Sequence, residues 1–387
     1  MTTRNPGYFR GSCWVIGCVL YLLVSLAQGC SSRSPEKVIS PAISSFGPVL
    51  NPSQLLGKKL FFDTHLSNPE GQSCATCHMP IVSFTDPEHL PVSRGANKSL
   101  FGRRNSPTVT YAAFTPYFHY DSLDEVYIGG LFWDGRAPTL QEQAMSPLLT
   151  QHEMNNADKG MVVDQVMKSD YRDLFLSVFG MNAFDNKEKA FEYISQALEE
   201  YEESEELSPF TSKFDYYMKG QIALSAAEMR GLDIFNDTLK GKCAACHPST
   251  PDPLTQAILF TDFTYDNLGV PANPELIELD SAYQPDLGLG ATIKQAKENG
   301  KFKVPTLRNI ANTAPYFHNG VFKTLEEVLD FYNSRDSGKF GPPEIAENVN
   351  HDELGDLKLT DQERKDVIAF MKTLTDGYAI QDSLALK

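Results

Sequence analysis

The pentapeptide Cys-X-X-Cys-His occurs twice in this 387-residue chain and limits what the chain can become more than any other feature. The two copies supply Cys74, Cys77 and His78, and Cys243, Cys246 and His247. This spacing is typical of covalent c-type haem, because two thiols bind the two porphyrin vinyl groups while the adjoining imidazole becomes the proximal iron ligand. A zinc ribbon and a redox dithiol are the alternatives. No other cysteine lies beyond residue 30, so we predict two haems and no disulfide framework.

The first thirty residues have the composition of an export signal. Arg4 and Arg10 precede an apolar run that ends at Ala27, and this run is too short to span a bilayer. Its end resembles a bacterial lipoprotein cleavage site before Cys30, although Ala27 stands where leucine is usual. We therefore predict a leader over residues 1–30, a periplasmic protein and a lipid anchor on Cys30. The alternative is that Cys30 is an ordinary leader residue that is removed.

The charge of the chain indicates what it can bind. Without the two leader arginines, 32 basic residues face 50 acidic ones, which gives a mature net charge of −18. This charge argues against nucleic acid as a partner and favours a basic redox protein, such as a small lysine-rich cytochrome. A mature chain of about 355 residues exceeds one ordinary core, so two domains are expected.

Short motifs recur in the same order in the two halves. A similar six-residue segment precedes each haem motif, at 56–61 and at 230–235, and a Pro-Thr pair and a Pro-Tyr-Phe-His sequence follow it. The spacing from Pro107 to His119 is 12 residues, and that from Pro305 to His318 is 13. Duplication of a one-haem unit is the simplest explanation.

The predicted fold class is mostly α, with two cytochrome c-like haem domains and long loops. Helical composition from Lys187 to Leu207 ends at Ser208-Pro209, so we place the boundary between an N-terminal domain, 31–207, and a C-terminal domain, 208–387. Capping boxes are predicted at Ser225 with Glu228 and at Thr360 with Glu363. The helix that follows Thr360 is the last, and we expect it to be free to pack back on the first domain.

Several further motifs carry a family resemblance. They are Arg104–Thr108, Phe132–Ala137, Glu153-Met154, Val304–Asn309 and Thr313–His318. With the two haem motifs, they resemble the bacterial di-haem cytochrome c peroxidase family, which includes the MauG-type enzymes, over roughly residues 45–376. The resemblance implies that hydrogen peroxide reacts at the N-terminal haem and that the C-terminal haem stores and passes electrons. It also implies a calcium ion that lies between the two haems. The implied source of electrons is a small cytochrome c, another redox protein or a protein substrate.

The same resemblance assigns roles to individual residues. His78 and His247 match the proximal ligands of the two haems, and Trp133 matches the aromatic electron bridge between them. Glu153 follows Trp133 by 20 residues and matches the distal glutamate, since peroxide cleavage needs a group that takes and returns a proton. His152 is the alternative for that role.

The calcium assignment also rests on the resemblance. Asn105, Thr313 and Pro315 match the family's calcium positions, where a side-chain oxygen and backbone carbonyls suit a hard cation. Read without the resemblance, these residues are typical of turns.

Departures from the family pattern point to the MauG-like branch. Members that are activated by reduction hold a histidine over the first iron, but residues 90–104 contain none and His89 falls too early, so the first haem is expected to be open. Tyr332 lies 14 residues after His318, where ordinary members have methionine and MauG-type enzymes have tyrosine. An anionic phenolate would stabilise ferric and higher oxidation states of the second haem. Met371, on the apolar face of the last helix, is the alternative ligand.

One further departure concerns the substrate. MauG-type enzymes that act on a protein carry tryptophan two residues before the second haem motif, where this chain has Gly241, which argues against maturation of methylamine dehydrogenase. The predicted function is thus a di-haem c-type peroxidase. The alternatives are a non-enzymatic di-haem electron-transfer cytochrome, with both irons six-coordinate and no use for Glu153, and a haem-based peroxide sensor.

Overall fold

The computed structural model describes residues 48–280 and 282–380, which belong to one compact unit. The predicted leader and Cys30 lie outside the described residues. Within the part of the chain that is described, no helix is both long enough and apolar enough to cross a membrane.

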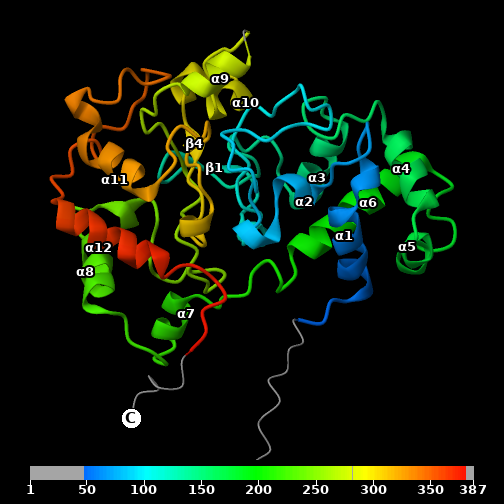
Figure 1. Ribbon diagram of the computed structural model, residues 1–387, viewed down its shortest axis with the longest axis horizontal. Coiled ribbons are helices and arrows are strands. Elements are labelled where there is room, and N and C mark those ends of the chain that lie inside the picture. Colours follow the sequence, from blue (N-terminus) through cyan, green and yellow to red (C-terminus); the bar gives the residue numbers. More distant parts are fainter. Residues whose placement is uncertain (1–47, 281, 381–387) are drawn as a thin grey trace, which may run out of the picture. The chain divides into compact units, whose positions relative to one another are not determined.

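The fold is mostly helical, as predicted, with long irregular segments between the helices (Figure 1). The α-helices in the described residues are α1 (Pro52–Phe62), α2 (Cys74–Cys77), α3 (Leu140–Leu149), α4 (Lys159–Lys168), α5 (Arg172–Phe179), α6 (Lys187–Glu202), α7 (Lys213–Met218), α8 (Ala226–Asn236), α9 (Pro274–Leu279), α10 (Leu289–Ile293), α11 (Leu325–Ser334) and α12 (Asp361–Lys372). Short 3-10 turns join them at Thr64–Leu66, Pro80–Val82, Ala112–Phe114, Cys243–Ala245, Ala296–Glu298, Ile310–Asn312 and Arg335–Ser337.

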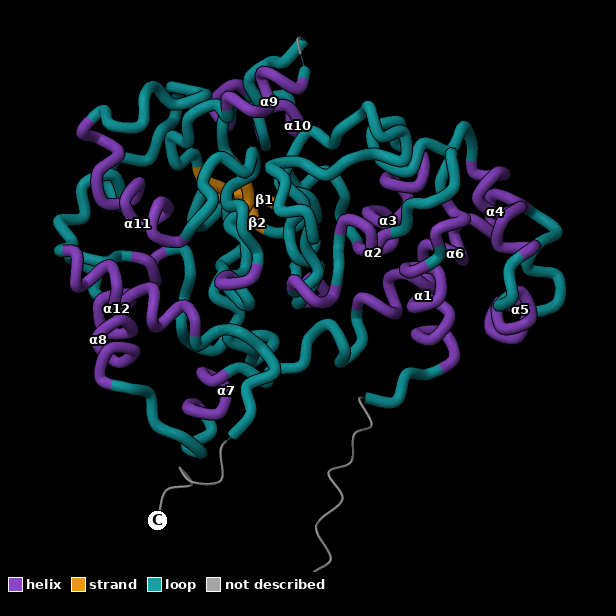
Figure 2. Tube along the Cα trace, viewed as in Figure 1, coloured by secondary structure: helices purple, strands orange, loops and turns teal. Residues whose placement is uncertain are grey.

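Two small antiparallel sheets lie among the loops that fill the middle of Figure 2. β1 (His119–Asp121) pairs with β2 (Val126–Ile128), and Tyr120 lies opposite Tyr127. β3 (Tyr265–Asp266) pairs with β4 (Phe302–Lys303), and Tyr265 lies opposite Lys303. Strands this short cannot form a core, so helices supply the core and loops supply the sites.

Helix ends follow the local chemistry of the sequence. Both predicted capping boxes are confirmed, at Ser225 for α8 and at Thr360 for α12. α6 ends at Glu202, five residues before the predicted end at Leu207. Carboxylates crowd this end of the helix, at Glu199, Glu200, Glu202, Glu203, Glu205 and Glu206. Negative charge at a helix C-terminus opposes the helix dipole, which accounts for the earlier end.

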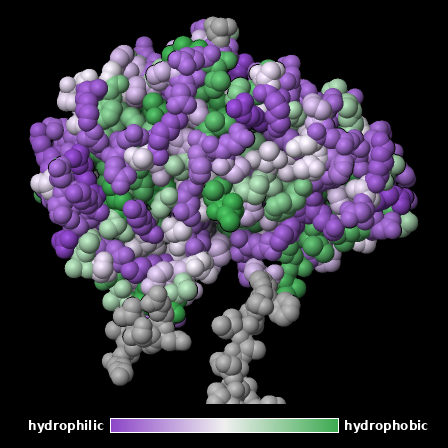
Figure 3. All heavy atoms as spheres, in the orientation of Figure 1, coloured by the Kyte–Doolittle hydropathy of each residue, from purple (hydrophilic) through white to green (hydrophobic). Residues whose placement is uncertain are grey.

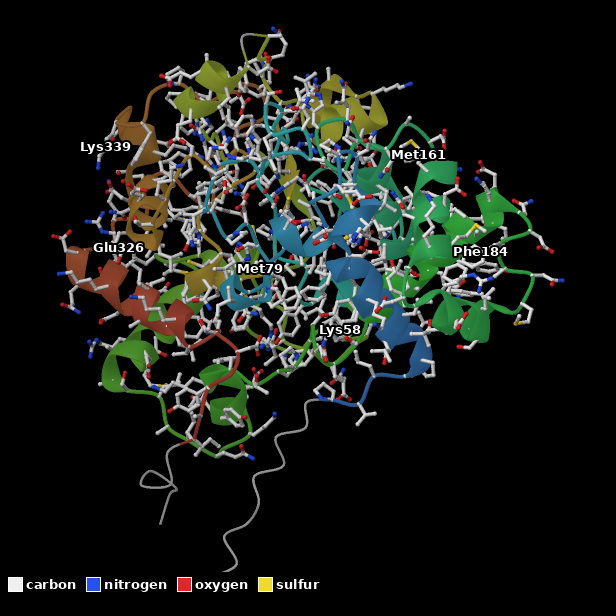
Figure 4. The ribbon with its side chains drawn as sticks, turned by 45° about the vertical axis from the view of Figure 1, so that its right-hand side comes forward. Lys58, Met79, Met161, Phe184, Glu326 and Lys339 are labelled. Carbon is white, nitrogen blue, oxygen red and sulfur yellow. The ribbon has the colours of Figure 1, made fainter. Side chains whose placement is uncertain are left out.

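The buried apolar residues form two main clusters. One draws its residues from Leu56 to Leu207 and includes the contact between α1 and α6, and the other draws them from Phe214 to Leu374 and includes the contact between α8 and α12. α1 precedes the first haem motif and α8 precedes the second. In Figure 1, α1 and α6 lie on one side of the loops and α8 and α12 on the other. An ion pair between Lys58 Nζ and Glu206 Oε2, at 2.7 Å, joins α1 to the turn after α6, and Figure 4 labels Lys58 on α1.

The last helix packs differently from the expectation. α12 packs chiefly on α8 and α11, in its own half of the chain, because its apolar face completes the second cluster. Contact with the first half comes from the segment after α12, where the Asp376 carboxylate accepts a hydrogen bond from the Tyr111 hydroxyl at 2.8 Å.

Candidate functional site

The two haem motifs have the same local geometry. The His78 amide donates to the Cys74 carbonyl and the His247 amide to the Cys243 carbonyl, each at 2.9 Å. His78 Nδ1 lies 3.2 Å from the Phe84 carbonyl, and His247 Nδ1 lies 2.7 Å from the Phe260 carbonyl. A bond at Nδ1 orients the ring and leaves Nε2 for iron. Figure 4 labels Met79, the residue directly after His78, and so marks the first motif in the ribbon.

The threonines of the repeated Pro-Thr pairs bind the backbone that orients these histidines. Thr108 Oγ1 donates to the Ser83 carbonyl at 2.7 Å, and Thr306 Oγ1 donates to the Leu259 carbonyl at 2.6 Å. Ser83 and Leu259 directly precede the two phenylalanines whose carbonyls face the imidazoles. Each threonine therefore fixes the backbone that orients a proximal histidine.

Burial gives both histidines the protonation state that iron requires. It lowers the pKa of His78, and it lowers the pKa of His247 to about 4. Both imidazoles are therefore neutral at pH 7, and a neutral imidazole is the form that binds a metal. All four thiols are free, as attachment to haem vinyl groups requires.

The second motif opens into a cavity of haem dimensions. Its empty volume is about 1360 Å³, part of it open to solvent, and Cys243, Cys246 and His247 share its wall with mostly apolar side chains. A macrocycle is a large apolar surface, so an apolar wall beside two thiols and a neutral imidazole fits haem c. The residues present therefore fit the group.

A carboxylate cluster lies beside this second motif. Among the described residues, one group of side chains that commonly bind metals has its ligand atoms close enough together to share an ion. It comprises Cys246, Asp266 and Glu353. Haem attachment at Cys246, as predicted, would occupy its sulfur, so we assign no separate ion to this cluster.

Glu153 lies in the turn that follows α3, beside the first motif. Its amide donates to the Thr150 carbonyl at 3.0 Å, and its carbonyl accepts from the Ala96 amide at 2.7 Å. Within the described chain, no hydrogen bond to its carboxylate is found. Burial, and then charges that include the Glu153 carboxylate, raise the pKa of the Cys77 thiol to about 11, and the pKa of Cys74 rises in the same way. Such an effect through space requires the carboxylate to lie near both thiols.

The environment of Glu153 also raises its own pKa. Burial is the main cause, and the positive charge of Arg136 acts in the opposite direction. Arg136 belongs to the Trp-Asp-Gly-Arg motif, yet the sequence analysis gave it no role. His152, the alternative, has its carbonyl against the backbone of Gly95, where an added Cβ would lie 2.6 Å from the carbonyl oxygen.

The loop after the first motif contains His89 and passes beside Glu153. His89 is exposed and its Nδ1 lies 3.0 Å from the Ala314 carbonyl. The following loop crosses Glu153 through the backbone of Gly95 and Ala96, which bring no side chain that can ligate iron.

Tyr332 and Met371 both line the second cavity. No hydrogen bond to the Tyr332 hydroxyl is found among residues 48–280 and 282–380, and burial raises its pKa. Tyr332 is partly buried at the cavity wall, so its hydroxyl is available to a partner inside the cavity. Met371 is 5% exposed and belongs to the apolar cluster of α12. The cavity therefore brings both candidate ligands to the site.

Trp133 lies where the two halves of the chain meet. Its indole Nε1 donates to the Asn105 carbonyl at 2.9 Å, and its own carbonyl accepts from the Lys303 amide at 2.8 Å. Its neighbour Asp134 pairs with Arg104 at 2.7 Å and with Arg136 at 2.8 Å. Trp133 also lines the second cavity. These contacts hold the indole at the wall of the second cavity.

The residues assigned to calcium lie on adjoining loops. Asn105 is buried, its amide donates to the His318 carbonyl at 2.7 Å, and its Nδ2 lies 3.3 Å from the Pro91 carbonyl. Thr313 Oγ1 donates to the Ile310 carbonyl at 3.3 Å, and Pro315 is buried between Thr313 and His318. The fold therefore brings the Asn105 loop against the loop that contains the other two residues.

Two further features of the second site concern Lys303, which no sequence motif singled out, and Gly241. Lys303 lines the cavity, its ammonium donates to the Gly130 carbonyl, and burial lowers its pKa to about 8. In the sequence, its position directly before the Val-Pro-Thr motif could have marked Lys303 as a residue of the site. Gly241 has no room for a side chain, since an added Cβ would lie 1.7 Å from the Ile234 carbonyl oxygen. An aromatic residue at this position would require the backbone to move.

These sites define a mostly helical c-type cytochrome with two haem-attachment centres in one compact unit. A family model described as di-haem cytochrome c peroxidase matches residues 52–223. The methylamine utilization protein MauG of Paracoccus denitrificans is 39% identical over 343 residues, which cover 83% of this chain and 88% of that protein. The cytochrome c551 peroxidase of Pseudomonas aeruginosa is 33% identical over 305 residues, which cover 78% of each chain.

Among solved structures, the diheme peroxidase BthA from Burkholderia thailandensis E264 aligns with a TM-score of 0.75 at 32% identity. The alignment covers 85% of this chain and 87% of that one. The chain therefore belongs to the di-haem cytochrome c peroxidase family, and it is an oxidoreductase that acts on peroxide with two c-type haems.

Proposed function

We propose that this chain reduces hydrogen peroxide at its N-terminal haem and shares oxidising equivalents with its C-terminal haem through Trp133. The observation that carries the proposal is the carboxylate of Glu153, which is partly buried, lies beside the first motif and has no hydrogen-bond partner in the described chain. Bound haem iron supplies the centre that holds peroxide and exchanges electrons. Cys74, Cys77 and His78 would hold the first haem, and Cys243, Cys246 and His247 the second.

Glu153 would handle the proton in peroxide cleavage. Its carboxylate takes the proton from the peroxide oxygen nearest the iron and returns it to the departing oxygen. Burial raises the pKa of this carboxylate, and the nearby Arg136 limits the rise. A carboxylate whose pKa is raised holds a proton more readily than an ordinary glutamate, which suits a group that must both take up and return one.

Tyr332 is our choice for the sixth ligand of the second haem. Its unpartnered hydroxyl and its place in the cavity support this choice, together with its spacing from His318. Deprotonation of a phenol with a raised pKa would have to be driven by the iron itself. The hard anionic ligand would favour the higher oxidation states of that centre.

Several finer features complete the proposal. The chain would consist of duplicated haem domains over 31–207 and 208–387, which the paired geometry of the two motifs and the two apolar clusters support. Calcium would bind between them, at Asn105, Thr313 and Pro315. The protein would act in the periplasm, anchored by a lipid on Cys30. Its reductant would be a basic cytochrome or a protein substrate, drawn to the hydrophilic surface seen in Figure 3.

An anaerobic peroxide titration with a panel of electron donors tests this function. A peroxidase with an open first haem should show a high-spin signal in the resting state and consume donor as peroxide is added. A pure electron carrier would show only low-spin haem and no turnover. A sensor would bind peroxide but consume donor only slowly.

The haem content should be two per chain, joined by thioether bonds, because both motifs are complete and both histidines are oriented alike. A pyridine haemochrome assay and peroxidase staining of denaturing gels measure this directly. Replacing Cys243 and Cys246 by alanine should leave one haem. A wild-type count of one, or haem that acid–acetone extracts, would contradict the assignment.

Replacing Trp133 by phenylalanine should leave both haems bound but slow electron sharing between them. Phenylalanine keeps the ring but is much harder to oxidise, and it loses the hydrogen bond to the Asn105 carbonyl. Stopped-flow spectra after peroxide should show oxidation confined to the first haem. If the second haem oxidises at the native rate, another path carries the electrons.

A further inference from the structure

A row of aromatic rings leads from Tyr265, which lies in a strand beside the second cavity, to the protein surface. Tyr265, at the inner end, is 7% exposed and lies 6.0 Å from Phe118, measured between ring centroids. Phe118 stacks on Tyr127 at 5.5 Å with an angle of 8° between the ring planes, and Tyr127 lies 4.9 Å from Tyr120. Tyr120, at the outer end, is 44% exposed.

The β1–β2 pair accounts for the outer part of this row. Tyr120 lies directly opposite Tyr127, and Phe118 precedes Tyr120 by two residues, on the same face of the strand. Directly opposed and diagonal side chains on one sheet face are close enough for ring contact. Tyr127 therefore lies between Phe118 and Tyr120.

The inner end of the row adjoins the electron bridge. Tyr265 lies opposite Lys303 in the β3–β4 pair, and the Lys303 amide donates to the Trp133 carbonyl at 2.8 Å. Gly135, two residues after Trp133, has φ +72°, and an added Cβ would lie 2.2 Å from the Tyr265 hydroxyl and 2.9 Å from the Phe118 ring. This glycine lets the Trp133 turn pack directly on the row. Asp266, the residue after Tyr265, lines the second cavity.

We propose that this row carries oxidising equivalents from the haem pair to Tyr120, which forms a second oxidation site for one-electron donors at the surface. The proposal rests on the proposed peroxidase function. Each hydrogen peroxide takes two electrons and two protons to become two waters. Tyr120 supplies them in two successive oxidations, each of which removes one electron and one proton from its phenol and leaves a neutral phenoxyl radical. After each oxidation an external donor restores the tyrosine with one electron and one proton, so two donor molecules are consumed for each peroxide.

The environment of each hydroxyl explains why the oxidation would reside at Tyr120. The Tyr265 hydroxyl is buried and donates to the Gly129 carbonyl at 2.5 Å, and a carbonyl cannot accept the released proton. The Tyr127 hydroxyl accepts a hydrogen bond from Gln295 Nε2 at 3.2 Å. Phe118 has no proton to release. Tyr127 is partly buried, whereas Tyr120 is 44% exposed, so the Tyr120 phenol is the one in the row best placed to pass its proton to water and to meet an external donor.

The charge beside Tyr120 selects the donor class. Asp121, Asp124 and Glu125 all belong to the β1–β2 turn region that adjoins this ring. Acidic side chains raise the local concentration of cations and repel anions. Cationic one-electron donors, such as a positively charged aromatic diamine, should therefore react at Tyr120 faster than anionic donors of similar potential.

The test exposes the full-length holoprotein to one equivalent of hydrogen peroxide, with a nitroso spin trap and no donor, and locates adducts by peptide mass spectrometry. Wild type should carry the adduct on Tyr120. Tyr120→Phe should lose it, and Tyr127→Leu should lose it although Tyr120 is still present and exposed. Tyr117→Phe is the matched control, since Tyr117 is 72% exposed and forms no ring pair with any described aromatic residue.

Haem spectra and peroxide consumption, recorded in the same samples, separate the two proposals. Peroxide consumption with no adduct on Tyr120, or an undiminished adduct in Tyr127→Leu, would overturn the aromatic route and leave the peroxidase in place. No consumption of peroxide by wild type would overturn the peroxidase and the route with it. Circular dichroism confirms that the Leu variant is folded, and Tyr127→Phe, which keeps the stacking, gives a second variant in which the adduct should fall.

Discussion

Replacing Glu153 by glutamine should slow peroxide cleavage by about 10²-fold or more, the size expected for the loss of a positioned acid–base group. Glutamine keeps the size of the side chain and the backbone contacts to Thr150 and Ala96, but it cannot take up a proton. Haem content should not change. Stopped-flow spectra at several peroxide concentrations measure the step, and native kinetics in this variant would remove Glu153 from the mechanism.

The pH dependence provides a second readout of the same residue. Burial raises the pKa of Glu153, and the carboxylate acts as a base only when it is deprotonated. The rate of the peroxide step should therefore fall as the pH falls through this raised pKa, at a higher pH than for an ordinary glutamate. This fall in rate at low pH, the acid limb of the profile, should be absent in Glu153→Gln. His152→Gln is the matched control from the adjacent position, and it should keep both the rate and the acid limb.

Replacing Tyr332 by methionine should change the spectrum and the potential of the second haem together. A neutral soft ligand in place of a hard anion raises the reduction potential of that haem and should introduce the long-wavelength absorbance band of ferric His/Met haem. The variant should also lose the two-electron-oxidised state that peroxide produces in the wild type. Spectroelectrochemistry and near-infrared spectra measure these effects.

The companion variant Met371→Leu decides between the two ligands. Leucine keeps the volume in the α12 cluster, so its cost should stay below about 1.5 kcal/mol of folding free energy. If Tyr332 is the ligand, the wild type lacks the methionine band and Met371→Leu leaves the spectrum unchanged. A methionine band in the wild type that disappears in Met371→Leu would transfer the assignment to Met371 and leave the peroxidase function in place.

Much of this protein could be predicted from local sequence, because the relevant chemistry is local. The capping boxes at Ser225 and Thr360 depend on side chains three residues apart, and both are confirmed. The family was also evident, since several motifs occur in a specific order. The end of α6 was misplaced because a sum of weak charge effects, rather than one helix breaker, decides where that helix stops.

The two haem motifs, the mostly helical fold and the family could all be read from the residues in order, because covalent attachment needs a few residue types at fixed spacing. Which distant residues share a site became evident only in the folded chain. The fold placed Glu153 beside the first motif, with its charge reaching Cys74 and Cys77, and it placed Tyr332 in the same cavity as His247. These pairings follow from packing over long separations in the chain, where each contact depends on many weak interactions and no local pattern records it.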